Sequence, residues 1–332
     1  MGKAKLYINK ILSYMDAQGI RGKIPFFVIL IDVVWCTLIY GATISDYFFF
    51  RFYKKRHCDR NTFMTARDKD RFYKAMNNVD NDTRKIVQNK DIFNEKFAEY
   101  LKRDCISVPE CGEQAFCDFL NTHEAVFIKP VATGGGAGIV KTSADKIGDV
   151  GAYYAQLCSE GTFVVEAGIV QHPDMAKIHP ESVNTVRFST LYDGEKVNIL
   201  FVCLRCGTGD SYMDNHMMGG VVMNVDPETG RVTSRASGKR YLQQERHPDT
   251  GVLFPGFQIP HWDKCLALID EVARKTGGIR YVGWDIAVLK DDICLIEANP
   301  SGDFNIYQEP TQTGCKAEMD AWIEKIQKTG EI

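Results

Sequence analysis

The chain has 332 residues, of which 45% are hydrophobic, and it carries 40 basic against 43 acidic side chains. This length and composition predict a large globular protein of two or three subdomains and exclude a disordered chain or a coiled coil. A formal net charge of −3 offers no overall attraction to nucleic acid, so no nucleic-acid partner is expected. The 11 cysteines lack the spacing of a zinc site or of a secreted disulfide framework, which favours reduced thiols in a cytoplasmic protein.

An apolar run at residues 24–41, IPFFVILIDVVWCTLIYG, follows a basic start. It is about long enough to cross a bilayer, but Asp32 lies mid-run, where a carboxylate costs about 2.5–3.5 kcal/mol. No small-residue cleavage site follows, which argues against a signal peptide. We favour a helical region that is buried or packed in a groove of a non-membrane protein, and contact with a membrane surface is the alternative.

Two regions with different patterns follow one another along the chain. Residues 1–103 are predicted to be mainly helical, because aromatic and aliphatic side chains recur at intervals of three and four among charges. From Ala125 onward the pattern changes to short β-rich runs, joined mostly by turns and by one long helical stretch at residues 262–278. This order predicts an α+β fold with an antiparallel sheet.

A glycine-rich loop follows the first of these runs, in VFIKPVATGGGAGIVK at residues 126–141. Glycines let a backbone approach a polyphosphate and point N–H groups at it, and a lysine supplies a point charge. The loop is bracketed by strands and does not open a helix, so it matches neither the P-loop nor the dinucleotide fingerprint. A flexible hairpin is the alternative. The candidate phosphate-binding residues are Lys129, Gly134, Gly135, Gly136, Gly138 and Lys141.

Two later strands, at residues 284–290 and 293–300, carry polar side chains in their interiors. Glu297 and Asn299 are two residues apart and share a face, and an antiparallel partner strand would bring Asp285 near them. Carboxylate and amide oxygens suit Mg²⁺ that also holds phosphate oxygens. A salt-bridged strand end is the alternative to a metal site.

Together the two patterns resemble the ATP-grasp superfamily of carboxylate–amine ligases, in matching order from residue 90 to residue 305. The resemblance implies an ATP-grasp fold with a helical region over 1–103, a lid subdomain over 104–168 and a C-terminal subdomain over 169–332. The nucleotide contacts that it implies are Lys90, Lys129, the loop from Thr133 to Gly138, Glu166, Ala167 and Ile169, with Gln171 or Asp174 near the ribose. The implied magnesium ligands are Asp285, Glu297 and Asn299.

The chain resembles most the sugar-transfer-associated ATP-grasp group, through SDYFFFRFY, NKDIFNEKF and HPESVNTVRFSTL. In the last of these, Asn184 and Arg187 stand close together and are candidate catalytic residues, with Arg205 as a further candidate cation. A surface arginine is the alternative for both arginines. Many ATP-grasp ligases have an arginine two residues before the first metal carboxylate, but this chain has Gly283, so the role would fall to Arg187, Arg205 or Arg280.

The resemblance implies an ATP- and Mg²⁺-dependent ligase that joins a carboxylate to an amine through an acyl phosphate. The expected partners are small-molecule carboxylates and amines that are sugar-linked or free, in capsule or exopolysaccharide biosynthesis. A kinase that uses the same ATP site and a non-catalytic nucleotide-binding scaffold for glycan assembly are the alternatives. Asn215, in a polar loop at residues 210–220, is a candidate acceptor contact.

Overall fold

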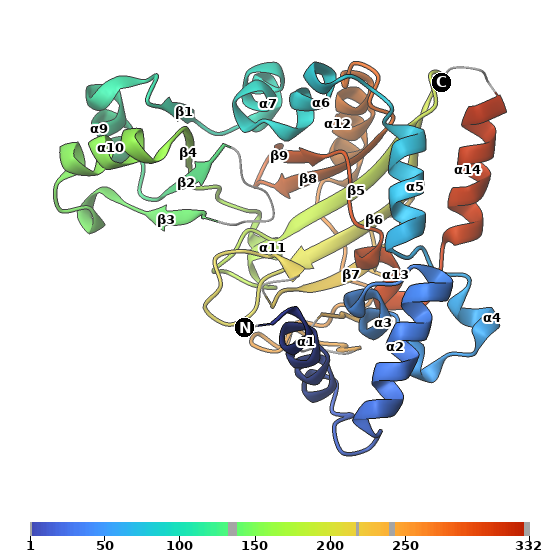
Figure 1. Ribbon diagram of the computed structural model, residues 1–332. Coiled ribbons are helices and arrows are strands. Elements are labelled where there is room, and N and C mark those ends of the chain that lie inside the picture. Colours follow the sequence, from blue (N-terminus) through green and yellow to red (C-terminus); the bar gives the residue numbers. More distant parts are fainter. Residues whose placement is uncertain (1, 132–137, 217–218, 239–242, 329–332) are drawn as a thin grey trace.

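The computed structural model describes residues 2–131, 138–216, 219–238 and 243–328 (Figure 1). The chain forms a cluster of helices at its N-terminal end, a small four-stranded sheet and a large five-stranded sheet. Neighbouring strands in both sheets are antiparallel. This arrangement confirms the predicted α+β class and the helical N-terminal region.

The N-terminal region folds around its aromatic residues. Thr43 and Asp46 form a capping box that starts the helix after residue 43, and the rings that follow, including Tyr47, Phe48 and Phe52, are fully buried. The SDYFFFRFY motif is therefore a packing element. The helices are α1 (Lys3–Ala17), α2 (Phe26–Tyr40), α3 (Ile44–Phe49), η1 (Phe52–Lys54), α4 (His57–Arg60), α5 (Ala66–Met76), α6 (Asn81–Gln88), α7 (Lys90–Lys96) and α8 (Ala98–Leu101).

The apolar run at residues 24–41 forms α2 and buries only one face of it. Gly41 ends the helix in a left-handed conformation with a φ of 66°, and the Arg67 side chain packs where a Cβ at this position would stand. Asp32 accepts hydrogen bonds from Arg60 and Tyr47, so its charge is neutralised inside the protein. Among the helices that the structure describes, none has both the length and the apolarity needed to cross a membrane.

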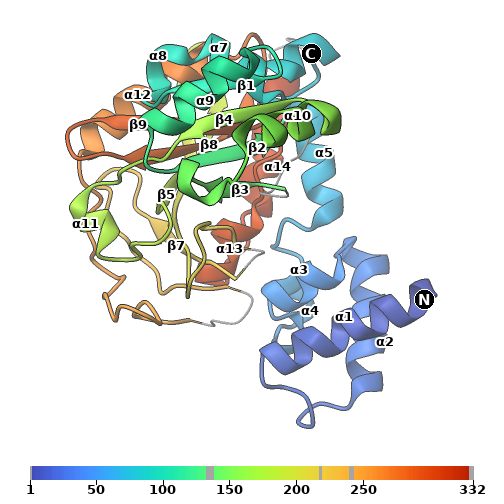
Figure 2. The same ribbon diagram turned by 90° about the vertical axis from the view of Figure 1, so that its left-hand side faces the viewer.

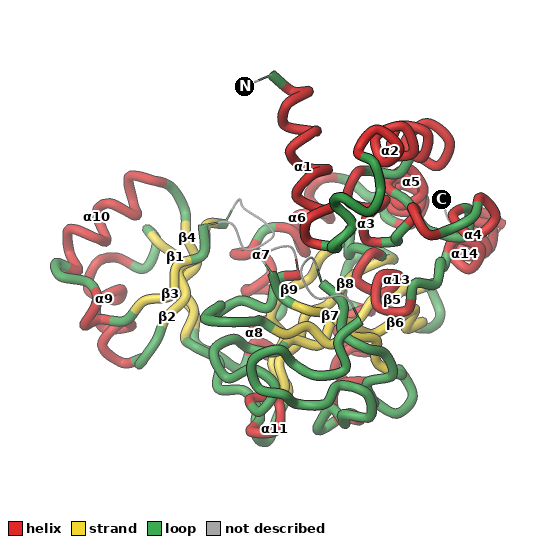
Figure 3. The backbone as a smooth tube through the Cα atoms, turned by 90° about the horizontal axis from the view of Figure 1, so that it is seen from below, coloured by secondary structure: helices red, strands yellow, loops and turns green. Residues whose placement is uncertain are grey.

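The small sheet orders its strands β1 (Cys105–Val108), β4 (Phe163–Ala167), β2 (Val126–Pro130) and β3 (Val140–Thr142). Helices α9 (Gly112–Thr122) and α10 (Val150–Glu160) pack together on one face (Figure 3), with the short η2 (Ala144–Lys146) after β3. The other face looks toward the large sheet (Figures 1 and 3).

The large sheet has the order β7-β6-β5-β8-β9. Helices α7, α8 and α12 cover one face, and α5, α13 and α14 cover the other (Figure 2). The connection between β4 and β5 contains the short α11 (Pro173–Ala176). The remaining elements are β5 (Thr185–Tyr192), β6 (Val197–Cys206), β7 (Val221–Val225), α12 (Trp262–Arg274), β8 (Tyr281–Val288), β9 (Ile293–Asn299), α13 (Asn305–Thr311) and α14 (Lys316–Lys328).

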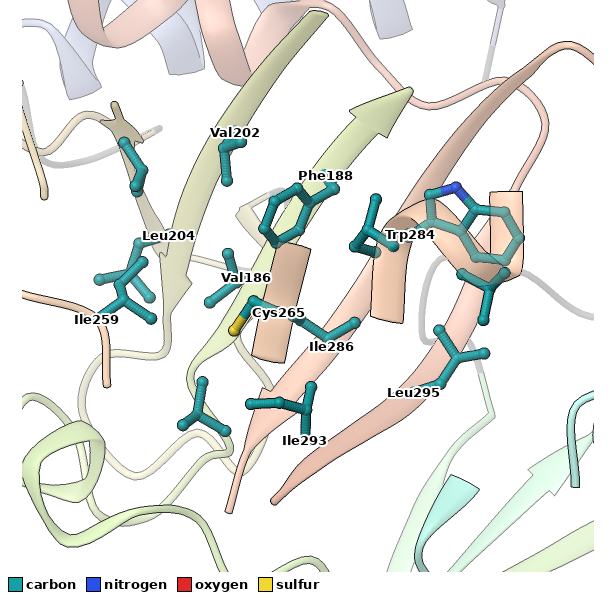
Figure 4. Packing of buried hydrophobic residues seen from close by; sticks show 14 of the residues in the cluster. Val186, Phe188, Val202, Leu204, Ile259, Cys265, Trp284, Ile286, Ile293 and Leu295 are labelled. Atoms are coloured by element: carbon teal, nitrogen blue, oxygen red, sulfur yellow. The ribbon is translucent and has the colours of Figure 1, made fainter. Parts of the chain in front are cut away.

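Alternation along the central strands positions the polar residues of this sheet. Val186 and Phe188 of β5 pack with Trp284 and Ile286 of β8 in the main hydrophobic core, under α12 (Figure 4). Successive side chains of a strand point to opposite faces. The residues between these pairs, at positions 187 and 285, therefore project from the other face of the sheet.

Candidate active site

A cavity of about 350 Å³ lies between the small and the large sheet. Strands β2 and β4 line it from the small sheet, and β5, β6, β8, β9 and the loop before β7 line it from the large sheet. A second cavity of about 420 Å³, lined in part by α7, shares Lys129, Glu166, Glu297 and Asn299 with the first. The two cavities form one cleft of the size that small-molecule sites usually have.

The cleft brings together residues that are far apart in the sequence. Most of the predicted site residues line it. They are Lys90, Lys129, Glu166, Ala167, Ile169, Arg187, Arg205, Asp285, Glu297 and Asn299.

An ion-pair cluster surrounds Asp285 in the cleft. Arg187 is its register partner on β5, and the Nε and Nη2 of Arg187 both donate to the carboxylate, the latter at 2.7 Å. Arg205 of β6 donates from Nη1 to Asp285 Oδ2 at 2.8 Å. Burial would raise the pKa of Asp285, but the two guanidinium groups hold it well below its usual range. Asp285 is therefore ionised at neutral pH.

Glu297 of β9 is the register partner of Asp285 on the other side. Desolvation and the neighbouring Asp285 carboxylate raise the pKa of Glu297, although its side chain is still 53% exposed, because two adjacent carboxylates resist double ionisation. A divalent cation would relieve this repulsion, so the pair fits the predicted Mg²⁺. Asn299 lines the cleft too, but its Oδ1 accepts from the amide of Ser301 at 3.0 Å.

The fit to Mg²⁺ rests on this pair of carboxylates and on the open cleft beside them. Within the described ranges, no group of three or more His, Cys, Asp or Glu side chains is arranged to hold a metal ion. Two carboxylates suffice for Mg²⁺, since this ion usually keeps several waters and binds substrate phosphates through its other positions.

Lys129 enters the cleft from the small sheet. Its Nζ donates to Glu166 Oε2 at 2.6 Å, and Arg103 Nε donates to the same oxygen at 2.8 Å. Burial would raise the pKa of Glu166, but the two cations lower it to about 2. The resemblance places Glu166 at the adenine, and the structure shows its carboxylate between two cations at the edge of the cleft.

Lys90 reaches the cleft from a third side, at the start of α7. Its Nζ donates to the carbonyl of Pro130 at 2.8 Å, one residue beyond Lys129. Burial lowers the pKa of Lys90. Two lysines from different elements thus meet at one end of the cleft, as a site for several phosphate oxygens requires.

Three predicted residues support a neighbouring loop and do not line the cleft. Asn184 is fully buried, and its Nδ2 donates to Gln171 Oε1 at 3.0 Å and to the carbonyl of His179 at 2.9 Å. Gln171 donates to the same carbonyl at 3.0 Å. Asp174 forms a surface ion pair with Lys177 at 2.6 Å. These bonds hold the turn that leads into β5.

The glycine-rich segment is described at its two ends. Gly138 has a φ of +75°, and a Cβ there would lie 3.0 Å from Pro130 Cγ, so the position favours glycine. Lys141 is exposed on β3, with its Nζ 6.0 Å from the ring centroid of Phe127, and it does not line the cleft. The predicted residues outside the described ranges are Thr133, Gly134, Gly135 and Gly136.

Sequence reasoning missed two acidic residues beside the cleft. Asp214 accepts from Arg205 Nη2 at 3.1 Å, and Glu309 lies 2.7 Å from the Nε2 of His216. Asn215, which stands between Asp214 and His216 in the sequence, lines the cleft. The polar composition of the loop before β7 was the only sign of these residues in the sequence. Their partners could not be predicted from it, because Arg205 lies on β6 and Glu309 lies on α13.

Gly283 lies where the ATP-grasp pattern usually has an arginine. A Cβ at this position would lie 3.3 Å from both Cδ and Nη1 of Arg187 and 3.2 Å from the Cα of Gly302. The Arg187 side chain therefore takes the space of a side chain at position 283. The structure thus brings Arg187, one of the three candidate arginines, against position 283.

Comparison with known proteins gives one family. The model of the family described as sugar-transfer associated ATP-grasp matches residues 67–325. No curated protein is similar enough to the sequence to count as a relative.

Three ligase or synthetase structures of low identity are among the solved structures that match part of the chain. The ATP-grasp ligase PsnB complexed with minimal precursor has 15% identity and a TM-score of 0.45, with 74% of this chain and 62% of that chain covered. D-alanyl-alanine synthetase A from Vibrio cholerae O1 biovar eltor has 8% identity and a TM-score of 0.48, with 74% and 66% covered. D-alanine–D-alanine ligase from Bacillus anthracis has 10% identity and a TM-score of 0.47, with 74% and 69% covered. The chain thus spans less than two thirds of the PsnB and synthetase structures.

Proposed function

Because the chain belongs to the sugar-transfer associated ATP-grasp family, we propose that it is an ATP- and Mg²⁺-dependent ligase that joins a carboxylate to an amine. The observation that carries this proposal is the cleft that holds Lys90 and Lys129 together with Asp285 and Glu297. The lysines suit a polyphosphate, and the paired carboxylates suit the divalent ion that accompanies it. In this proposal the enzyme works in the cytoplasm, in the biosynthesis of a capsule or exopolysaccharide.

In this proposal each subdomain contributes a different part of the ATP site. Residues 104–168 form the lid subdomain, and residues 169–332 form the C-terminal subdomain, which bears the carboxylates. Residues 1–103 form a helical region that supplies Lys90. ATP would lie between the sheets, with its phosphates toward the two lysines and the carboxylates.

The proposed reaction has two displacements. A carboxylate oxygen of the first substrate attacks the γ-phosphorus of ATP, and ADP leaves, so that an acyl phosphate forms. The amine nitrogen of the second substrate then attacks the acyl carbon, the amine loses a proton, and inorganic phosphate leaves. Bound Mg²⁺, held by Asp285 and Glu297, would supply charge neutralisation at the phosphates.

The chain's own residues would do the remaining work by position and charge. Lys90 and Lys129 would bind and orient phosphate oxygens. Arg187 is preorganised by its two bonds to Asp285, and it would stabilise the negative oxygen that develops when the amine attacks. Arg205 adds a second fixed cation at the same carboxylate.

The test is ADP release measured with pairs of carboxylates and amines, followed by mass spectrometry of the products. The proposal expects ADP release that needs both substrates, with an amide product and free phosphate. A stable product phosphorylated on a hydroxyl, formed without an amine, would identify a kinase. ATP binding with no turnover for any pair would favour the scaffold.

A further inference from the structure

The N-terminal helices expose an apolar surface that the ATP site does not use. Ten of the thirteen large hydrophobic side chains that are exposed among the described residues belong to α1 and α2. These ten residues, the N-terminal apolar surface, are Leu6, Tyr7, Ile8, Phe27, Val28, Ile31, Val34, Trp35, Leu38 and Ile39. Both helices lie at the end of the molecule remote from the small sheet (Figures 1 and 2), and their inner sides pack in one hydrophobic cluster.

On α2 the exposed residues form a continuous stripe. Positions 27, 31, 34 and 38 follow the helical repeat, and the opposite side of the helix packs into the protein. Leu38 is 69% exposed and Trp35 is 53% exposed. Soluble monomers rarely leave so large a contiguous apolar stripe uncovered, so this one needs a covering partner.

The only acidic side chain of α2, that of Asp32, is turned away from the stripe. Asp32 accepts from Arg60 Nη1 at 2.6 Å and Nη2 at 2.9 Å, and from the Tyr47 hydroxyl at 2.8 Å. A helix that crosses a bilayer would carry this carboxylate into the hydrocarbon, whereas a helix that lies in the interface leaves it with its partners.

Basic residues accompany the apolar surface. The only acidic residues between positions 2 and 41 are Asp16, which pairs with Arg21 at 2.6 Å, and Asp32. Lys5, Lys10 and Lys23 are exposed. These lysines give the surroundings of the apolar surface a surplus of positive charge.

We propose that the N-terminal apolar surface binds the anionic surface of a lipid bilayer, with α2 lying in the plane of the interface. α2 has 15 residues and is therefore about 22 Å long, less than the roughly 30 Å of a hydrocarbon core. An apolar stripe with aromatic residues and nearby lysines is the pattern that such interfacial helices share.

Charge complementarity decides between lipid and a second copy of the chain. A two-fold dimer seated on this surface would bring together two surfaces that carry the same surplus of positive charge. An anionic headgroup layer instead attracts all of them.

The experiment is flotation of the full chain with vesicles, in the absence of detergent. One set contains phosphatidylcholine alone, and the other contains phosphatidylcholine and phosphatidylglycerol in equal parts. We expect binding to the second set, weaker binding at high salt, and a blue shift of tryptophan emission that Trp35→Phe removes. Combining Ile31→Ser, Trp35→Ser and Leu38→Ser should lower the partition coefficient at least about tenfold, since each removes an apolar side chain from the bilayer.

The matched control is Leu253→Ser, which changes an exposed leucine, 44% accessible, outside the surface and should bind like the wild type. Equal binding to both vesicle sets, or no binding of the wild type to either, overturns the proposal. A wild-type dimer that the triple variant converts to a monomer also overturns it, and assigns the surface to self-association. The emission shift tests the proposal in the unaltered protein, whatever the triple variant does to folding.

Discussion

Arg187 and Asp285 are register partners on adjacent strands, and the guanidinium of one donates two hydrogen bonds to the carboxylate of the other. Both side chains are buried, and Arg205 adds a third bond to the same carboxylate. Removing one member of a buried pair leaves an uncompensated charge, at a cost of about 3–5 kcal/mol. The position of both arginines in the cleft therefore depends on Asp285.

Replacing Asp285 by asparagine should sharply lower the turnover of the protein that still folds. Asparagine still accepts hydrogen bonds, but it brings no charge for the arginines or for Mg²⁺. We expect the ATP turnover number to fall at least about 100-fold. Mg²⁺ titration of ATP hydrolysis should also need higher metal concentrations. Wild-type turnover in a variant with a normal circular dichroism spectrum would contradict the assignment of this carboxylate.

Gly283→Ala should disturb Arg187 without changing any charge. The added Cβ would meet Arg187 and Gly302 at 3.2–3.3 Å, closer than ordinary contact, so the side chain of Arg187 has to shift. We expect a loss of about 1–3 kcal/mol in the free energy of unfolding, as other overpacked sites show. kcat should fall while the KM for ATP stays nearly constant, because Arg187 is proposed to act on the acyl group.

The matched control for this prediction is Gly148→Ala. A Cβ at position 148 meets nothing within 4 Å. Its unfolding free energy should match the wild type within about 0.5 kcal/mol, and its kcat should be unchanged. Similar losses in both alanine variants would show that contact with Arg187 is not the cause.

Lys129→Met should weaken ATP binding, because methionine keeps most of the apolar part of the side chain and removes its charge. We expect the KM for ATP to rise about 10- to 100-fold, the range that one charge-assisted phosphate contact supplies. Isothermal titration with ATP and Mg²⁺ measures the effect on binding directly. Lys146→Met, on the exposed η2, is the control and should leave binding unchanged. Equal affinity of the Lys129 variant and the wild type would remove this lysine from the ATP site.

Glu166 should make the protein sensitive to acid. Its pKa is about 2 in the folded protein, against about 4.3 in an unfolded chain. A carboxylate with a lowered pKa stabilises the fold fully above its unfolded pKa, and the stabilisation disappears as the pH falls toward the folded pKa. We expect Glu166 to contribute about 3 kcal/mol at neutral pH, lost progressively between about pH 5 and pH 2.

Urea unfolding from pH 7 to pH 3 tests this expectation. The unfolding free energy of the wild type should fall more steeply below about pH 4.5 than that of Glu166→Gln. Glu124→Gln removes an exposed carboxylate and should follow the wild-type curve. Parallel curves for the wild type and the Glu166 variant would show that the two cations do not stabilise this carboxylate.

Short-range sequence patterns predicted the helices and strands well, but they did not predict which residues contact each other across the fold. The alternation in β9 placed Glu297 and Asn299 on one face, and antiparallel pairing placed Asp285 beside them, because strand periodicity is a local property. The pairing of Arg187 with Asp285 joins residues 98 positions apart, and it depends on the register of two strands that no local pattern reveals.

Asn184 and α2 are two further places where local sequence patterns do not reveal the long-range contacts. Asn184 looked catalytic because it stands near Arg187 in sequence, but its amide satisfies a buried turn. In α2 nearly every side chain is apolar, so the sequence contains no periodic contrast from which to choose the buried face. On the inner side of the helix Arg60 binds Asp32, a contact between residues 28 positions apart that no local pattern reveals.

Arg103 gives the cleft a mechanical property. It lies in the connection between α8 and β1, and it donates to Glu166 of the small sheet at 2.8 Å and to the carbonyl of Leu295 in the large sheet at 2.6 Å. One guanidinium thus fastens the two sheets at a single point close to Lys129. A rotation of the small sheet about this point would keep these bonds, and it would displace the far tip of the sheet most and the lysine least.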